Sequence, residues 1–386
     1  TRKHLLEWDE PMDFQRKEFY AVRQAILEER DLPKLILDTI DNVIRSTLQK
    51  HLGKNFVRSC IVEWCRSQLD LVIDEDAIQT DELGTAIRSV REKAKDEAHD
   101  QVRTSVGEYI DADEPPAQWD VGGLLQWAQR AFHFSMTQNQ LRKMEPREIE
   151  NALLEAANEH YDSIDLSGIS IYLHPQYALQ SLADWARNKF AIKVDVAEFV
   201  DFPEAEIRRL LEERIREAYR QREMSYPVES CLERAFAEVG TDSAAAADLV
   251  VQWTNAKYNV GWTLVDVQGQ SLHELHDRLL TLSREYFSGR LEREVDDQIT
   301  GKPQDEAFDW ARKRFVFGWN DRKIEQFNGN PRNAIVAIGR ESLRWELTRL
   351  EQYVLLRIYD QAWKDHLLEM DHLKTAIMQR PLGGDQ

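Results

Sequence analysis

The stretch SLRWELTRLEQYVLLRIYDQAWKDHLLEMDHLKTAIMQR, residues 342–380, contains neither glycine nor proline. Its apolar residues recur every three to five positions, a period that places them along one side of an α-helix. They are Leu343, Leu347, Leu350, Val354, Ile358, Leu367, Met370, Leu373 and Ile377. At about 1.5 Å per residue this helix would be roughly 60 Å long. A helix of that length needs a partner along its apolar side.

The other end of the chain carries a second apolar stripe, between Asp13 and Leu52. Its members are Phe14, Phe19, Val22, Ile26, Leu32, Ile36, Ile40, Val43, Leu48 and Leu52. The spacing predicts one long helix, bent at Pro33, because a proline ring disturbs the helical hydrogen-bond ladder. We expect the two ends of the chain to pack on each other as an antiparallel pair, with the middle looping out between them.

The middle of the chain repeats a short pattern around five tryptophans, about 60 residues apart. An acidic or amide residue precedes each tryptophan, a small residue follows it, and an apolar residue stands five positions later. The pairs are Trp64 with Leu69, Trp127 with Phe132, Trp185 with Phe190, Trp253 with Tyr258 and Trp310 with Phe315. The recurrence indicates about five copies of one helix–connector–helix unit.

A helix start signal follows the connector of each copy. Proline loses no needed N–H in a first helical turn, and Ser, Thr, Asp or Asn caps the free amides there. The five signals lie at residues 80–82, 145–148, 202–204, 271–274 and 330–332. Two further segments, residues 168–173 and 260–267, alternate like short strands and are expected to be extended connectors or a small hairpin.

Composition supports a mainly α fold, because glycine (16) and proline (11) are sparse in 386 residues and helix-forming residues dominate. The length allows two or three domains. We predict long antiparallel helices from residues 1–52 and 333–386, and between them, over residues 53–332, a helical region of about five repeated helix–connector–helix units.

The net charge of -19 argues against wrapping nucleic acid or binding anionic lipid, since both partners are themselves negative. The three cysteines form neither a disulfide framework nor a Cys-x-x-Cys pair, which is typical of a reducing compartment. No leader follows Thr1, and no apolar run approaches the roughly 20 residues of a membrane span. We therefore expect an excised cytoplasmic segment.

Motifs for chemistry are incomplete. Residues 53–55 and 301–303 contain Gly-Lys but lack the earlier glycine and the hydroxyl of a phosphate-binding loop, so we expect no ATP binding by this chain. His273 and His276 are three residues apart, whereas zinc-protease helices space their histidines four apart. We expect no metal there, and no acid–base pair from His366 and His372, which are six residues apart.

Both ends of the chain resemble the SecA family of protein-translocation ATPases. At the N-terminus the resemblance is carried by Leu5, Leu6, Glu7, Trp8, Asp9, Glu10, Met12, Gln15, Arg16, Tyr20 and Arg23. At the C-terminus it is carried by Leu356, Arg357, Asp360, Trp363, Lys364, Asp365, His366, Leu367, Met370, Asp371, Leu373, Ile377 and Arg380. These segments look like the long scaffold helix and the first helix of the two-helix finger. Trp119, Asp120, Gly123 and Leu124 are similar to the start of the helical wing.

The resemblance implies a non-catalytic scaffold and wing region of an ATP-driven export motor, cytoplasmic and peripheral at the inner face of the cell membrane. ATP and Mg would belong to motor domains outside this chain, and the partners would be those domains, the preprotein and the Sec channel. Residues expected at the scaffold–motor contact are Trp8, Gln15, Arg16 and Tyr20. Residues expected to contact the channel or the preprotein are Trp363, His366, Met370, Asp371, Arg380 and Leu382.

The sequence departs from the family pattern in three ways. The family usually has tyrosine at the position of Trp8, and commonly has tyrosine at the finger tip, where this chain has Leu382. The usual wing is about one unit long, whereas residues 53–332 suggest about five. The chain ends at Gln386, before a second finger helix. One alternative is a free-standing helical repeat scaffold unrelated to export; another, an enzyme using His273 and His276, has less support.

Overall fold

The computed structural model describes the backbone of residues 2–111, 114–237, 244–316 and 319–379, and the side chains of that part from residue 11 to residue 376. All regular elements in these ranges are helical, which confirms the predicted mainly α fold. The chain divides into two compact units. We call Thr1–Asp41 with Glu213–Gln386 the terminal unit, and Asn42–Glu212 the central unit.

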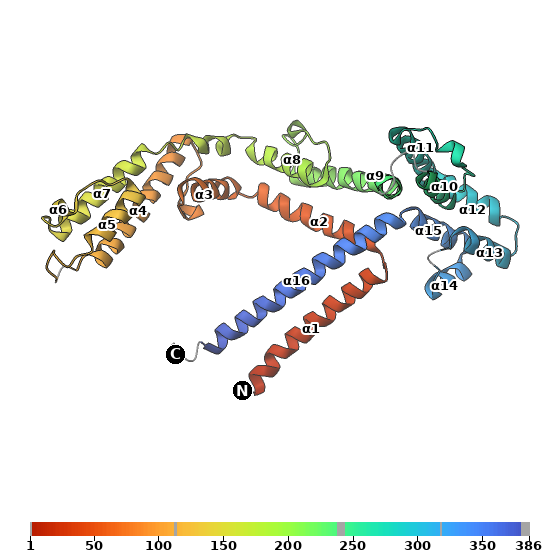
Figure 1. The fold of residues 1–386 in the computed structure, drawn as a ribbon, viewed down its shortest axis with the longest axis horizontal. Coiled ribbons are helices and arrows are strands. Elements are labelled where there is room, and N and C mark those ends of the chain that lie inside the picture. The colour runs from red at the N-terminus through yellow and green to blue at the C-terminus, as the bar shows by residue number, and fades with distance from the viewer. Residues whose placement is uncertain (1, 112–113, 238–243, 317–318, 380–386) are drawn as a thin grey trace. The chain divides into compact units, whose positions relative to one another are not determined.

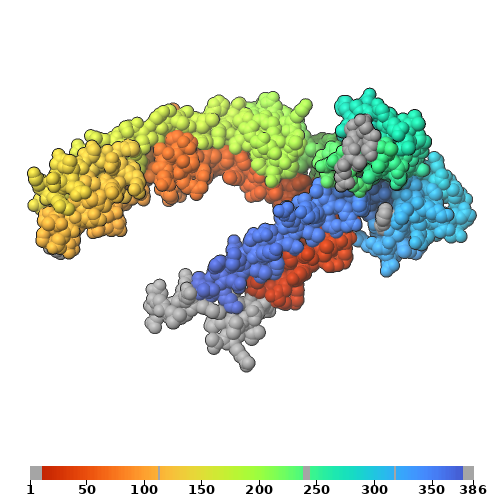
Figure 2. All heavy atoms as spheres, viewed as in Figure 1, coloured from red at the N-terminus to blue at the C-terminus, as the bar shows by residue number. Residues whose placement is uncertain are grey.

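The two ends of the chain lie side by side in the terminal unit as helices α1 (Arg2–Leu27) and α16 (Trp345–Gln379) (Figure 1). The start of α1 and the end of α16 lie at the same end of the pair. Where both helices are drawn in colour, their atoms touch (Figure 2). Gln15, early in α1, contacts His366 in the late part of α16. Late in α1, the backbone carbonyl of Ile26 accepts from Gln352 in the early part of α16. The predicted antiparallel pair is therefore confirmed.

The predicted single N-terminal helix is wrong, because the chain forms two helices, α1 and α2 (Leu32–His51). The break precedes Pro33, which lies in the first turn of α2, where its missing N–H is no loss. Glu29 and Asp31 have positive φ angles of 55° and 49°, so the backbone between α1 and α2 is not helical. The bend predicted at Pro33 thus lies a few residues earlier, at Glu28–Asp31.

Each of the five repeated tryptophans lies in a helix that is followed by a connector, a short helical element and a second helix. The tryptophan helices are α3 (Phe56–Leu69), α5 (Val121–Phe132), α8 (Tyr177–Phe190), α10 (Ala244–Tyr258) and α13 (Gln304–Arg314). The short helical elements are η1 (Glu75–Ala77), α6 (Gln138–Leu141), η3 (Val196–Glu198), η4 (Leu264–Asp266) and α14 (Asp321–Gly329). The second helices are α4 (Leu83–Tyr109), α7 (Pro146–Ser163), α9 (Glu204–Ala237), α11 (Leu272–Glu285) and α15 (Pro331–Leu343).

One local geometry recurs where these tryptophan helices end. In the last four, the tryptophan packs edge to face on the aromatic ring five residues later, with ring centroids 5.4–6.1 Å apart. In the first four copies, the residue after the apolar residue at that position (Leu69, Phe132, Phe190 or Tyr258) has a positive φ: Asp70, His133, Ala191 and Asn259. A left-handed residue stops a helix and turns the chain outward. The predicted boundaries, scaffold at 1–52 and 333–386 and five units over 53–332, stay a prediction.

The predicted helix starts are confirmed. Helices α7 and α15 begin with Pro146 and Pro331 in their first turn, and Asn330 caps α15 by accepting from the backbone of Asn333. Ser271 caps α11 in a capping box with Glu274. Helix α4 follows Glu82, and α9 begins at Glu204.

The two predicted strand-like segments are not strands. Residues 168–173 belong to the 3₁₀ helix η2 (Ser167–Leu173), and residues 260–267 form an extended connector that ends in η4. Gly168 lies against the ring of Trp64, so close that a Cβ there would stand 2.9 Å from Trp64 Cζ2. This contact with the first tryptophan helix, which the local alternation does not encode, accounts for the compact turn.

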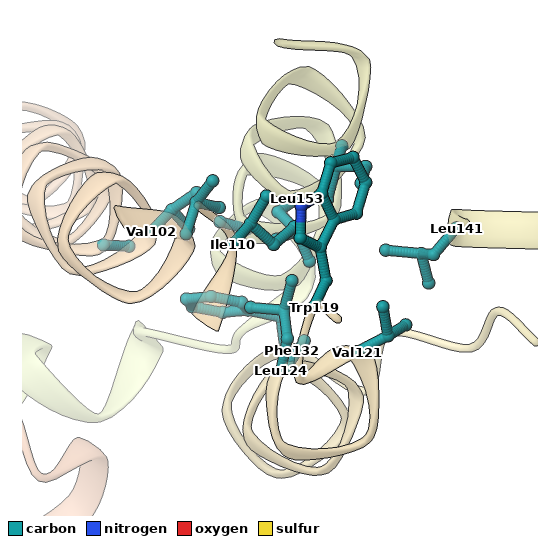
Figure 3. Close-up of a cluster of buried hydrophobic side chains, with 13 residues drawn as sticks. Val102, Ile110, Trp119, Val121, Leu124, Phe132, Leu141 and Leu153 are labelled. Atoms are coloured by element: carbon teal, nitrogen blue, oxygen red, sulfur yellow. The ribbon is translucent and has the colours of Figure 1, made fainter. Parts of the chain in front are cut away.

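Helices α5 and α7 of the second repeat enclose a core of their own with α4 (Figure 3). The core includes Val102, Ile110, Trp119, Val121, Leu124, Phe132, Leu141 and Leu153, all buried. Trp119 lies at its centre in Figure 3, and its indole N–H donates to the carbonyl of Asp111 at 2.8 Å. In the terminal unit, the chain kinks within η5 (Tyr286–Arg290), where the backbone of Ser288 and Gly289 is not helical, and continues into α12 (Leu291–Ile299), which packs on α15.

Candidate functional site

The contact between α1 and α16, here called the seam, is the candidate functional site because it brings together residues that the sequence singled out near both ends of the chain. Phe19 of α1 stacks on Trp363 of α16, with centroids 4.7 Å apart and planes 11° apart. One turn along α16, His366 lies 5.6 Å from the Trp363 ring, and its Nε2 is 2.9 Å from Gln15 Oε1. The structure thus brings Gln15 together with Trp363 and His366. Their expected contacts, of Gln15 with the motor domains and of Trp363 and His366 with the channel or the preprotein, stay predictions.

The end of α1 is capped by a side chain of α16. Gln352, which is buried, donates from Nε2 to the carbonyl oxygens of Ile26 at 3.1 Å and Leu27 at 3.0 Å. Arg349 also pairs with Glu29 at 3.2 Å. The last carbonyls of a helix have no partner within it, so these contacts fix where α1 stops. Sequence analysis did not single out Gln352; an amide on the apolar side of a long helix is the signal that was available.

The middle of the seam carries an ion pair between Arg23 and Asp360. Arg23 donates from Nε to Asp360 Oδ1 at 2.8 Å and from Nη2 to Oδ2 at 3.3 Å, a two-point contact. The hydrogen bond from Arg23 holds the pKa of Asp360 below its usual value, and the same bond raises the pKa of Arg23. Both side chains stay about one-third exposed, so salt screens the pair.

The remaining predicted residues lie outside the centre of the seam. Arg16 and Tyr20 are exposed, and Tyr20 touches only the edge of the Phe19 ring among the aromatic contacts of the described residues. Met370 is half-buried and Asp371 is exposed. Trp8 belongs to α1 by its backbone, but its side chain lies outside the described part, as do Arg380 and Leu382 altogether.

A second face of α16 is apolar and exposed. At 100° per residue, Val354, Ile358 and Leu368 project on the side of α16 opposite to Gln352, Trp363 and Met370, which face α1. Ile358 and Leu368 are each 58% exposed and Val354 is 40% exposed. On α1, Phe14 and Tyr20 are 65% and 55% exposed. The helix pair therefore leaves large apolar side chains uncovered on α16 away from the seam and on α1.

Potential metal ligands do not gather at one place in the described residues. Among them, no three His, Cys, Asp or Glu side chains lie close enough together to hold a metal ion. His273 and His276 lie on the exposed side of α11 and each approaches Asp277, at 3.5 and 3.4 Å. No helix in the described ranges combines the length and apolar character needed to cross a bilayer.

Comparison with known proteins connects these helices with one family. A family model described as "SecA Wing and Scaffold domain" matches residues 1–103 and 79–385, which together span nearly the whole chain. The chain is 25% identical to "Protein translocase subunit SecA 1" of Rhodopirellula baltica over 403 aligned residues, which cover 97% of this chain and 32% of that protein.

Shorter segments match other relatives more closely. The chain is 62% identical over 29 residues to "Protein translocase subunit SecA" of Desulforapulum autotrophicum, covering 8% of this chain and 4% of that protein. It is 40% identical over 56 residues to the protein of the same name from Chloroflexus aurantiacus, covering 14% and 6%. No solved structure matches. The chain thus spans about a third of the length of the Rhodopirellula relative.

Proposed function

This chain belongs to the SecA wing and scaffold family, and from that premise we propose that it couples the motor domains of a SecA-type translocase to the preprotein and the Sec channel. The α1–α16 pair is the proposed scaffold and residues 53–332 are the proposed wing. The uncovered apolar face of α16 carries the proposal, because exposed apolar stripes on helices mark contact surfaces. Family membership does not favour the alternative of a repeat scaffold unrelated to export.

We assign the two ends of the scaffold to different partners. Val354 and Ile358 lie in the first half of α16, and we propose that they pack on the motor domains together with Arg16 and Tyr20 of α1. Met370 and Asp371 lie toward the far end of α16, before Arg380 and Leu382. That end is the proposed contact with the channel and the preprotein. Gln15, Trp363 and His366 then hold the two helices together, so that both contacts share one rigid support. We propose Trp8 as a further contact with the motor domains.

A second part of the proposal concerns chemistry. We propose that this chain has no catalytic activity of its own, and that ATP and Mg are bound by motor domains of the same translocase. The incomplete Gly-Lys motifs at residues 53–55 and 301–303 support this. Purified chain should hydrolyse ATP no faster than a protein-free blank. A rate well above the blank that persists through further purification would contradict it.

The proposed location is the cytoplasm, with peripheral attachment at the inner face of the cell membrane. The translocase relatives support it. Attachment would run through the Sec channel, since the acidic chain has little attraction for anionic lipid. Cell fractionation should find the protein with membranes when the channel is present and in the soluble fraction when the channel is depleted.

The test of the scaffold role is binding of the full 386-residue chain to the motor domains of its own translocase, produced as a separate protein. A triple variant, Tyr20→Ser with Val354→Ser and Ile358→Ser, should weaken this binding at least tenfold, because it removes three exposed apolar side chains of the proposed motor contact. Val72→Ser and Val265→Ser are matched controls, since these valines are 76% and 82% exposed in connectors.

Two outcomes would count against the proposed contact. Equal affinity of the triple variant and the unchanged chain would show that the α16 face is not the binding surface. Equal weakening by the connector controls would show that exposed aliphatic side chains anywhere on the chain promote the binding. Circular dichroism of each variant checks that the helices are retained.

A further inference from the structure

The junction between α15 and α16, here called the elbow and formed by Leu343, Arg344 and Trp345, holds an unusual number of buried charges. Arg344 is 7% exposed and Glu351, two turns into α16, is 8% exposed. Lys257 of α10, which lies against the elbow, is also 7% exposed. Buried charges are costly unless they are paired and hydrogen-bonded, so their arrangement at one point calls for a physical explanation.

Lys257 joins the two helices of the elbow. Its ammonium donates to the carbonyl oxygens of Ser342 and Leu343 at 3.0 Å each, which are the last carbonyls of α15. Its third donor goes to Glu346 in the first turn of α16. A cation at a helix C-terminus and an anion at a helix N-terminus both match the helix dipoles. All three ammonium protons are therefore used at one place.

Trp253 completes this side of the elbow. Its indole N–H donates to the other oxygen of Glu346 at 2.7 Å, and its ring lies under the ammonium of Lys257, 5.1 Å from ring centroid to Nζ. Trp253 and Lys257 are one turn apart on α10, so both face the elbow. A repeated tryptophan that elsewhere packs in its own unit here also binds the start of the scaffold helix.

Arg344 joins the elbow to α9 on the other side. Its Nη2 contacts both carboxylate oxygens of Glu351 at 2.9 Å and the hydroxyl of Tyr219 at 2.8 Å. Its Nε lies 3.1 Å from Glu223 Oε1, an ion pair without the geometry of a hydrogen bond, and the Tyr219 hydroxyl donates to Glu351 at 2.7 Å. Burial raises the pKa of Glu223 and of Glu351, while the charge of Arg344 opposes the rise. One guanidinium thus holds groups from α9, the elbow and α16 together.

We propose that Lys257 and Arg344 are positioning residues that fix the direction of α16 relative to α9 and α10, so that these helices move as one rigid lever. The contacts are directional, involve four helices and are shielded from water, which makes rotation at the elbow costly. With a length of about 53 Å, α16 would shift at its far end by about 9 Å for a tilt of about 10° at the elbow. The use of this lever in export rests on the proposed function, but its rigidity does not.

The experiment measures the distance between spin labels on α9 and α16 in the full chain. Labels are placed on Arg220→Cys and Glu369→Cys, which are exposed positions in the terminal unit. Cys60 is replaced by serine, because it is half-buried, whereas Cys65 and Cys231 are buried and protected from labelling. The unchanged elbow should give one narrow distance distribution.

The main variant is Lys257→Met with Glu346→Gln, which removes both charges and leaves no unpaired ion. It should remain folded, with a distance distribution at least twice as wide. Arg344→Met with Glu351→Gln should widen the distribution in the same way. Arg332→Gln is the matched control: it breaks an exposed two-point pair with Asp296 in the same unit and should leave the width unchanged.

The outcomes separate a positioning role from general stabilisation. Unchanged widths in both double variants would overturn the proposal, whatever their melting temperatures. Widening by Arg332→Gln as well would also overturn it, because the effect would then not be local to the elbow. If a double variant does not fold, Trp253→Phe, which removes only the indole donor to Glu346, decides: a wider distribution supports the proposal and an unchanged one contradicts it. None of these measurements involves translocation, so they do not depend on the motor-binding test.

Discussion

The second repeat and the seam both cover apolar helical surface, and they do so to very different extents. In the second repeat, Trp119, Leu124, Phe132 and Leu153 are all 6% exposed or less, and helices α4, α5 and α7 enclose them. In the seam, Phe19 and Trp363 are only half-buried although they stack face to face. The repeat closes its own core, whereas the pair of long helices does not.

The difference follows from geometry. Three helices and a connector can surround a core on all sides, but two helices touch along one line only. The opposite side of α16 therefore stays open to solvent, with Ile358 and Leu368 more than half exposed. A structure that is complete by itself and one that needs a partner thus occur in the same chain. The four predictions below test this contrast.

The largest effect is expected in the repeat core. Leu153→Ala should lower the free energy of unfolding of the central unit by about 3 kcal/mol, because it leaves a cavity where a fully buried side chain was. Urea denaturation followed by tryptophan fluorescence measures the loss. Leu154→Ala is the matched control, since the neighbouring leucine is only half-buried. An equal loss in both variants would mean that the repeat has no closed core.

A smaller loss is expected in the seam. Trp363→Ala should destabilise the terminal unit by about 1–2 kcal/mol, through the lost stack on Phe19 and its half-buried area. Trp345→Ala, on the same helix but 40% exposed, should cost less. Thermal unfolding of the three proteins gives the comparison. A loss for Trp363→Ala as large as that for Leu153→Ala would contradict the contrast between the two regions.

The ion pair of the seam should contribute less than the stack. A double-mutant cycle with Arg23→Gln and Asp360→Asn should give a small coupling that shrinks as salt is raised. Because the pKa of Asp360 is lowered in the folded state, the coupling is present at neutral pH and is lost as the pH falls through that lowered pKa. A coupling that grows in acid, or that ignores salt, would rule out an ion pair of this kind.

The smallest effect is expected on the open face of α16. Leu368→Ser should change the free energy of unfolding by less than about 0.5 kcal/mol, because the side chain has little cover to lose. Leu347→Ser, near the start of the same face, should cost several times more, since Leu347 is only 4% exposed. Urea denaturation of both variants measures this ratio. A large loss for Leu368→Ser would show that this face is already covered within the chain.

The sequence predicted the elements of the fold well wherever the deciding contacts are local. The glycine-free run from Ser342 onward becomes α16, and Ser271 and Asn330 start the helices that they were expected to start. The spacing of five between tryptophan and aromatic residue becomes an edge-to-face pair. In the candidate site, the sequence predicted that the chain ends pair, but no sequence signal indicated that Gln15 meets His366 or how far each side chain is buried.

Two predictions failed because a distant residue decided the outcome. The end of α1 depends on Gln352, more than 300 residues away in the sequence, whose amide donates hydrogen bonds to the carbonyl oxygens of Ile26 and Leu27. Residues 27–32 contain no glycine or proline that would indicate the break between α1 and α2. The alternating segment after Gly168 becomes a 3₁₀ helix against Trp64, about 100 residues earlier in the chain.

The sequence by itself determined most of the helices, their caps and the tryptophan pattern, because periodicity and capping act over a few residues at a time. It also predicted the pairing of the two chain ends, because each end carries a long apolar stripe that needs a partner. Only the tertiary structure decided which charges are buried. Lys257 and Arg344 look like ordinary surface residues in the sequence, yet they meet Glu346, Glu351 and Tyr219 inside the terminal unit. Burial depends on helices that arrive from distant parts of the chain, and no local pattern specifies their arrival.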